Sequence, residues 1–186
     1  MNKRLDAFAA APVLVLVLCA ASTDSRAALS STTDSKIGFQ ASGPAGLKIE
    51  GTTSDLTVAD ASGNVVLTVP LANLSTGIGL RDKHMKEKYL EIDKYPAAVL
   101  TVARSALKFP ASGGSTETDV PGTLQLHGQT KPVTVHYDAR GDGAGFAAHG
   151  KFHINMNDYG IQVPTYLGVT VKPDVDVTAS FHVAGS

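Results

Sequence analysis

The sequence has one cysteine, Cys19, and no tryptophan among its 186 residues. A single cysteine excludes an intramolecular disulfide and a cluster of thiolate metal ligands. Charge of one sign is not in excess either, because 16 Lys and Arg stand against 17 Asp and Glu, a formal net charge of −1. Nucleic acids and anionic membrane surfaces attract excess positive charge, so the composition argues against both as partners. The remaining composition, 43% hydrophobic and 18% charged, is that of a globular protein of about one domain.

Long apolar runs are also scarce, and the clearest lies near the N-terminus. Residues 7–21 are almost entirely apolar, and the basic residues Lys3 and Arg4 precede them. This run is shorter than the roughly 20 residues that span a bilayer, so no membrane-spanning helix is expected. In Ser25-Arg26-Ala27, small residues stand at the two positions that a signal peptidase reads. We therefore interpret residues 1–27 as a cleaved signal peptide.

Cleavage at this point would leave a mature chain of residues 28–186 without cysteine. Such a chain is expected to be periplasmic or secreted. A lipoprotein anchor at Cys19 is the alternative interpretation, although Leu18 stands where that anchor needs a small residue.

Beyond residue 34, apolar and polar residues alternate with a period of two, which is typical of half-buried β-strands. Each strand then has one apolar and one polar face, which favours an antiparallel meander over a parallel sheet covered by helices. The sequence predicts an all-β fold of seven or eight strands, with a tight turn at residues 62–64. The alternation is clearest in residues 36–41, 47–50, 56–58, 65–71, 124–126, 133–137, 146–156 and 175–183.

Two architectures fit this pattern, a sandwich with a filled core and a closed barrel with an interior cavity. The lack of tryptophan and the mixture of large and small residues on the apolar faces favour the barrel. An eight-stranded barrel leaves room for one small ligand. Pro70 cannot donate to a β-ladder, so its strand should lie at an edge or a bulge there.

Residues 81–90 break the strand pattern. They are rich in helix formers, lack Gly and Pro, and place their apolar residues at helical spacing. We predict a short helix between two strands. Arg81 and Asp82 have two interpretations: they dock this helix on the barrel rim, or they meet the polar head of a ligand together with His84.

The other histidines fall on the polar faces of the predicted strands, so we expect them to point outward into solvent. If two strands pair through a four-residue loop, His136 lies directly opposite His149. A divalent metal site there lacks a cysteine or an ordered carboxylate to complete it, and no metal site is predicted. These outward histidines are His127, His136, His149, His153 and His182.

Motifs of catalysis are missing as well. The sequence contains no G-x-S-x-G, H-E-x-x-H, P-loop or paired dinucleotide-binding glycines. Glu91 and Asp93 form a carboxylate pair on paper, but their context is a surface loop, where solvated charges are the ordinary interpretation. An enzyme is therefore not predicted.

Four segments resemble the YceI-like family. Residues 81–85 (RDKHM), followed by 93–96 (DKYP), resemble the R-D-x-H-[LM] stretch of the family and the Tyr-Pro that comes after it. Residues 122–133 (GTLQLHGQTKPV) are similar to its G-x-L-x-[IL]-H-G-x-T-[KR]-P-V signature. Residues 154–161 (INMNDYGI) are similar to its I-x-R-x-D-[FY]-G-[IV] segment, and 35–39 (SKIGF) to its opening S-x-I-x-F.

The resemblance implies an extended eight-stranded, lipocalin-like antiparallel β-barrel formed by residues 28–186, with a long isoprenoid or related lipid in its apolar interior. An isoprenoid-type lipid or a quinone is then the expected ligand, with no other cofactor. Met156 stands where the family usually has Arg, and Tyr89-Leu90 replaces a Phe-Phe pair. The first hairpin also looks shorter, which implies a smaller cavity or a different lipid.

The predicted ligand contacts fall into two groups. Apolar strand residues should line the lipid tail, and residues of the helix and of the 154–161 segment should surround the entrance. The tail contacts are Ile37, Phe39, Leu100, Leu126, Phe152, Ile154 and Phe181, and the entrance residues are His84, Met85, Tyr89 and Tyr159.

The sequence thus predicts an exported, non-catalytic protein that holds a long-chain lipid or isoprenoid for transport or storage. Each buried CH₂ contributes about 0.8 kcal/mol, so a long tail binds through apolar area alone. The alternative is a filled all-β envelope module that binds another protein through its surface. An exposed edge near Pro70 leaves a homodimer open.

Overall fold

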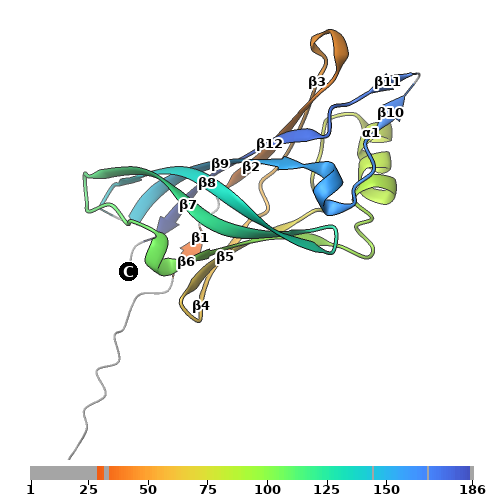
Figure 1. The fold of residues 1–186 in the computed structure, drawn as a ribbon. Helices are drawn as coiled ribbons and strands as arrows, with labels where there is room; N and C mark the ends of the chain where they lie inside the picture. The colour runs from red at the N-terminus through yellow and green to blue at the C-terminus, as the bar shows by residue number, and fades with distance from the viewer. Residues whose placement is uncertain (1–28, 32–33, 144, 167, 185–186) are drawn as a thin grey trace, which may run out of the picture.

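The structure is a computed structural model that describes residues 29–31, 34–143, 145–166 and 168–184 (Figure 1). The predicted signal peptide, residues 1–27 with Cys19, lies outside the described residues. In the described part, ten strands form one antiparallel sheet and two more form a separate hairpin. The all-β antiparallel prediction is confirmed, and the sheet has more strands than the eight expected.

The large sheet contains β1 (Ser30–Ser31), β2 (Lys36–Ser42), β3 (Lys48–Thr53), β4 (Thr57–Ala61), β5 (Asn64–Pro70), β6 (Ala97–Ala103), β7 (Ser115–Leu126), β8 (Gln129–Gly141), β9 (Gly145–Asn155) and β12 (Asp174–Ala184). The separate hairpin contains β10 (Thr165–Tyr166) and β11 (Val169–Thr170). The helical elements are η1 (Pro44–Gly46), α1 (Gly79–His84), η2 (Met85–Tyr89), η3 (Arg104–Ala106) and η4 (Met156–Tyr159).

The sheet curls into a half-barrel (Figure 1). Its strand order is β3-β2-β12-β9-β8-β7-β6-β5-β4, so β3 and β4 lie at opposite edges although they are consecutive in the chain. Among the described residues these two edges share no ladder, and Thr52 of β3 instead forms an isolated bridge with Ser75. Where β2 stops opposite Ser180, the two residues of β1 take over the free edge of β12 and also contact β4.

The β4–β5 hairpin confirms two predictions. Ser62 and Gly63 form its tight turn with φ angles of 50° and 79°, the left-handed conformation that such hairpin turns require. Pro70 pairs with Ala97 of β6 on one side. On the other side, β4 begins at Thr57 opposite Thr68 and does not reach Pro70. The strand edge at Pro70 is therefore uncovered by β4, as its missing N–H group demands.

The predicted helix is also present. α1 and η2 run without a break over residues 79–89, and the second half is a π-helix in which Leu90 N donates to Met85 O at 2.8 Å. The Asp82 carboxylate accepts hydrogen bonds from Ser75 Oγ at 2.6 Å and from Thr76 N at 2.7 Å. Arg81 Nε donates to Thr76 Oγ1 at 2.8 Å. Both side chains bind the turn that precedes the helix, in agreement with the docking interpretation.

The helix marks one end of the half-barrel, and the two ends differ in packing. At the helix end, Met85 and Tyr89 pack against a cluster of buried residues that includes Leu126, Ile154 and Tyr159. At the other end lies a smaller cluster of Val102, Val120, Val135, Tyr137 and Ala139. We call these the helix end and the turn end, the latter after the β4–β5 and β8–β9 turns that lie there (Figure 1).

Acid should weaken the docking of the helix through Asp82. Partial burial alone would raise the pKa of this carboxyl, but the hydrogen bonds from Ser75 and Thr76 outweigh it and lower the pKa to about 2. A lowered pKa means that the carboxylate stabilises the fold above about pH 4 and loses this contribution as the pH falls towards 2. We expect Asp82→Asn to lower the melting temperature at pH 7 by a few degrees and to flatten its acid dependence.

Circular dichroism melts from pH 7 down to pH 2 would measure this effect. Asp93→Asn, which makes the same change at an exposed site beyond the helix, is the matched control. An Asp82→Asn variant with the acid dependence of the unmodified chain would contradict the assignment.

Candidate ligand-binding site

An apolar cavity of about 90 Å³ lies on the concave side of the half-barrel, at the turn end. Strands β4 to β9 and β12 supply its wall, and Leu29 and the 107–109 loop complete it. Nearly all atoms that face the cavity are apolar. Lys108 and His149 are ionisable residues on its border. Because the lining is almost wholly apolar, the cavity suits a hydrocarbon ligand.

The wall of this cavity is not fully packed. Leu67, Leu100, Phe152, Ala179 and Phe181 lie on the concave face, and each is only half-buried although the alternation assigns it to the interior. In a filled core, apolar residues on the interior face are close-packed on all sides. The concave face at the turn end thus presents apolar surface that the described residues leave partly uncovered.

The 107–109 loop is fixed at the rim of the cavity. The Tyr137 hydroxyl accepts a hydrogen bond from Lys108 N at 2.7 Å and donates to Lys108 O at 3.1 Å. The Phe109 ring packs against Phe146 with 5.6 Å between ring centroids, and the Arg104 guanidinium lies 4.9 Å above Phe109. Arg104 also pairs with Asp60 next to the β4–β5 turn. These contacts hold the Phe109 and Phe146 rings at the rim of the apolar cavity wall.

Three predicted tail residues, Leu100, Phe152 and Phe181, line the cavity. The alternation also assigned Val65, Val135, Phe146, Ala148 and Val183 to the same interior face, and all of these line it as well. Leu107 and Phe109 lie in a loop without periodicity, so no sequence signal marked them.

The other predicted tail residues lie outside the cavity wall. Ile37 is buried, and Leu126 and Ile154 belong to the packed cluster at the helix end. The Phe39 ring lies across Gly51 on the neighbouring strand, where a Cβ atom would come within 2.3 Å of the ring. Their contact with a ligand stays a prediction.

The predicted entrance residues lie at the helix end, away from the cavity. Tyr159 is 2% exposed at the centre of the packed cluster, and Met85 and Tyr89 cover that cluster from the helix. His84 lies on the exposed face of the helix. Sequence reasoning placed the entrance beside the helix, whereas the cavity lies at the turn end.

His127 does not lie on a solvated strand face, so that prediction is wrong. It occupies the β7–β8 turn with a φ of 49°, and its side chain is 12% exposed. Nδ1 lies 2.9 Å from Tyr159 O, and Nε2 lies 3.0 Å from Glu91 Oε2. Hydrogen bonds from Lys94 and His127 lower the pKa of Glu91. The ring thereby ties the exit of the helix to the β7–β8 turn and to η4.

The pairing of His136 with His149 is also wrong. His136 lies opposite Lys151, and His149 lies opposite Asp138. The β8 strand runs one residue further than expected because Gly141 exchanges hydrogen bonds with the 113–114 turn, at 3.0 Å each. The four-residue loop starts one residue later than expected. The partner of each β8 residue on β9 is therefore shifted by two residues, so that His136 faces Lys151 and not His149.

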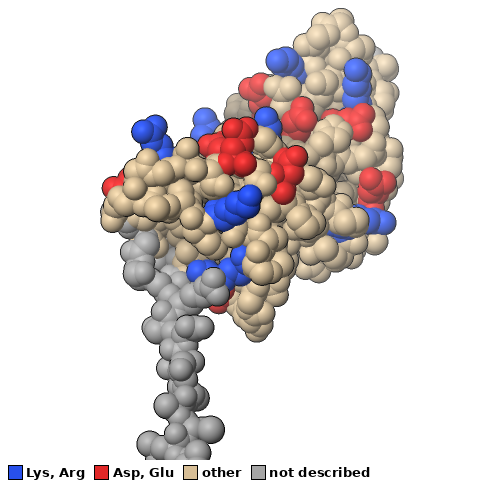
Figure 2. Space-filling model, turned by 60° about the vertical axis from the view of Figure 1, so that its left-hand side comes forward, with Lys and Arg blue, Asp and Glu red and all other residues tan. Residues whose placement is uncertain are grey.

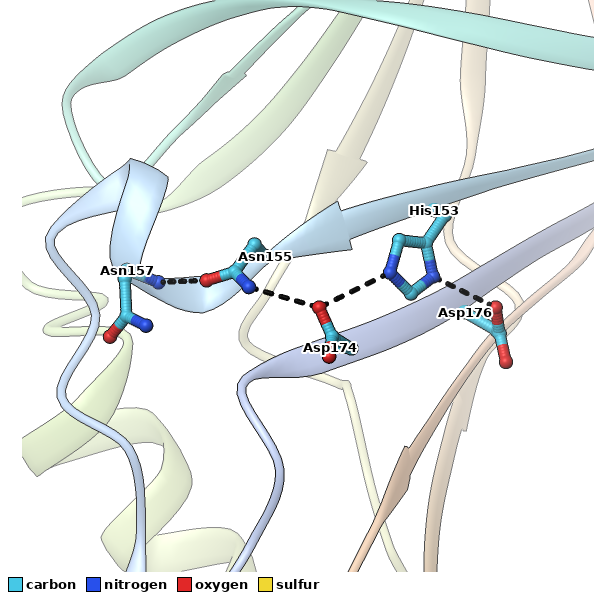
Figure 3. Close-up of polar contacts among 5 residues, drawn as sticks. All are labelled: His153, Asn155, Asn157, Asp174 and Asp176. Carbon is cyan, nitrogen blue, oxygen red and sulfur yellow. Dashed lines mark hydrogen bonds and ion pairs between the residues drawn. The ribbon is translucent and has the colours of Figure 1, made fainter.

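Acidic side chains gather in the middle of the face drawn in Figure 2. On the outer face of the sheet, His153 Nδ1 lies 3.1 Å from Asp176 Oδ1, and Nε2 lies 3.4 Å from Asp174 Oδ1 (Figure 3). His136 is held in the same way by Asp119 at 2.7 Å and Glu117 at 3.1 Å. A carboxylate faces each ring nitrogen, and these contacts join β7 to β8 and β9 to β12.

Metal ligands and membrane-spanning helices were both considered for the described residues. Across the described ranges, no set of three or more His, Cys, Asp or Glu side chains is arranged to hold a metal ion. In the same part of the chain, no helix has both the length and the hydropathy needed to cross a bilayer.

With this geometry established, comparison with known proteins identifies the class. The model of the YceI-like domain matches residues 30–183. A UPF0312 protein of Pseudomonas syringae pv. tomato is 33% identical over 138 residues, which are 69% of this chain and 67% of that protein. The chain belongs to the YceI-like family.

Solved structures share the fold. A domain from Saccharophagus degradans, described as polyisoprenoid binding and implicated in plant cell wall breakdown, has a TM-score of 0.71 at 20% identity. The likeness covers 87% of this chain and 99% of that domain. BcnA of Burkholderia cenocepacia has a TM-score of 0.62 at 17% identity, covering 82% of this chain and 96% of its own. At these identities the likeness supports the fold alone.

The ion pair of His153 allows a direct test of the outer face. The hydrogen bond to Asp176 raises the pKa of His153, partial burial opposes the rise, and Asp174 adds to it. A raised pKa stabilises the fold below about pH 6.5, and the contribution is lost as the pH rises through the folded value. We expect Asp176→Asn to return the pKa of His153 towards its ordinary value.

Nuclear magnetic resonance titration of the histidine rings would measure this shift. Glu117→Gln makes the equivalent change beside His136 and should leave the titration of His153 unchanged. If His153 titrated alike in Asp176→Asn and in the unmodified chain, the assigned pairing would be refuted.

Proposed function

We propose that this protein binds the hydrocarbon chain of an isoprenoid or related lipid on the concave face of its half-barrel, and that it holds this ligand without transforming it. The observation that carries the proposal is the apolar cavity at the turn end, whose wall residues Leu100, Phe152 and Phe181 are only half-buried. Apolar surface that a chain leaves uncovered in a concave site is the usual mark of a ligand pocket.

Relatives support the same ligand class. The Saccharophagus degradans domain is described as polyisoprenoid binding, and it shares the fold over nearly its whole length. The YceI-like match covers the strands that make up the cavity wall. Transport or storage is the role that fits a site whose described lining is apolar and offers little chemistry to a bound chain.

The size of the cavity constrains the ligand. Pockets for drug-sized ligands measure roughly 300–1,000 Å³, whereas this cavity measures about 90 Å³. The enclosed part therefore takes a short segment of the chain, and further carbons lie along the half-buried wall. Because each buried CH₂ contributes about 0.8 kcal/mol, affinity should rise by about fourfold per methylene until the wall is covered.

Filling the cavity should weaken the binding of an isoprenoid chain. Ala148 of β9 lines the cavity, whereas its neighbour Ala147 points outward and is exposed. We expect Ala148→Phe to weaken the binding of farnesol by at least tenfold, and Ala147→Phe to bind as the unmodified chain does. Isothermal titration calorimetry with geraniol, farnesol and geranylgeraniol would measure both the effect and its dependence on chain length.

Equal binding by Ala148→Phe and Ala147→Phe would rule out the cavity as the site. If the unmodified, folded chain bound none of these alcohols and no palmitate, a filled surface-interaction module would replace the lipid-binding proposal.

Export belongs to the same proposal. Cleavage after Ala27 is supported by the basic residues at 3 and 4, the apolar run at 7–21 and the small residues Ser25 and Ala27. We expect the mature protein in the periplasm or the medium, beginning at Ala28. Mass spectrometry of the intact protein from each cell fraction would detect this terminus, and an uncleaved N-terminus in the cytoplasm would refute export.

A further inference from the structure

Exposed apolar side chains concentrate at the helix end. In the part of the chain that the structure describes, five large apolar residues are exposed, and four of them lie there: Leu47 at 40%, Ile78 at 54%, Leu80 at 62% and Val169 at 41%. Single exposed apolar residues are ordinary on protein surfaces. Four at one end, on three separate segments, are not explained by packing, because none of the residues that the structure describes covers them.

The three segments meet over one core. Leu47 lies at the tip of the β2–β3 hairpin, Ile78 and Leu80 at the start of the helix, and Val169 in the β10–β11 hairpin (Figure 1). Ile49, Met85 and Val171, from the same three segments, all pack against the buried cluster of the helix end. The exposed residues therefore lie on segments that meet at one end of the molecule.

Basic residues accompany them. An exposed lysine lies within three residues of three of these apolar side chains: Lys48 after Leu47, Lys83 after Leu80 and Lys172 after Val169. Lys88, which is also exposed, lies five residues after Lys83 on the same helix. Three carboxylates lie on these segments: Asp82 is bound by Ser75 and Thr76, whereas Glu50 and Glu87 are exposed.

We infer that the helix end is a docking surface for an anionic phospholipid bilayer. Apolar tips surrounded by lysines match the interface of such a membrane, where the tips enter the acyl boundary and the ammonium groups meet the lipid phosphates. The net charge of −1 argued against this partner, but it is a sum over the whole chain. The three segments themselves carry more positive than negative charge, with Lys48, Arg81, Lys83, Lys86, Lys88 and Lys172 against Glu50, Asp82 and Glu87. The inference does not depend on the cavity being a lipid site, because the cavity lies at the turn end.

Vesicle binding tests the docking surface. The full-length mature chain should sediment with vesicles of phosphatidylcholine and phosphatidylglycerol, and at least tenfold less with phosphatidylcholine alone. Each lysine near an anionic surface contributes about fivefold to binding, so Lys83→Glu with Lys88→Glu should lower it by at least tenfold. Added salt should weaken binding, because screening shortens the range of exposed charges.

Lys36 and Lys151 provide the matched control, since both are exposed on the sheet away from the helix end. Changing both to Glu alters the net charge by the same amount and should leave vesicle binding within twofold. Ile78→Ser with Leu80→Ser should weaken binding without a change in charge. Farnesol binding should persist in all these variants, which separates a failure of docking from a failure of the cavity.

The absence of tryptophan allows a second readout. A single tryptophan introduced as Leu80→Trp should shift its emission to the blue on anionic vesicles, whereas Lys151→Trp should not. No binding to either vesicle, or equal loss in the two double lysine variants, would overturn the inference.

Discussion

The concave face of the half-barrel is apolar along its whole length, and the rest of the structure depends on how that face is covered. A sheet with one apolar face must bury it against other elements or leave it to a ligand. At the helix end, Met85, Tyr159 and Val171 close over it from three different connections. At the turn end the 107–109 loop and Leu29 are the covering elements on the described cavity wall, and a cavity remains between them and the strands.

The coverings are held by a few polar contacts between loops. Asp82 fixes the start of the helix to the 75–76 turn, and His127 joins Glu91 to the carbonyl of Tyr159. At the other end, Tyr137 holds the 107–109 loop through both backbone groups of Lys108. Each of these contacts fixes a connection between strands, so the sheet itself is common to both ends, and the connections decide which end is filled.

This division explains what the sequence could and could not reveal. Alternation is a property of strands, so it correctly placed Leu100, Phe152 and Phe181 on the interior face. It carries no information about position along the barrel axis. Ile154 is buried in the cluster of the helix end, whereas Phe152, two residues away on the same face, packs against that cluster and also lines the cavity. The alternation also assigned His127 to the polar face of a strand, whereas this residue lies in the β7–β8 turn, where its side chain is largely buried.

Register is the second limit. The pairing of β8 with β9 differs by two residues from the expected one because of hydrogen bonds between Gly141 and the distant 113–114 turn, a contact that local pattern cannot contain. Patterns within one strand fix which face a residue takes. Contacts between connections fix where along the strand its partners lie.

The separation of the two ends also bears on how a ligand could be exchanged. If the helix end rests on a bilayer, the cavity at the turn end faces the aqueous phase, since the two lie at opposite ends of the same strands. Direct transfer of a chain from that bilayer into the cavity would then require the protein to leave the surface and turn over. Transfer to or from a soluble partner at the Phe109 rim would not. The geometry therefore favours a protein that is held at a membrane while its ligand is exchanged on the side away from it.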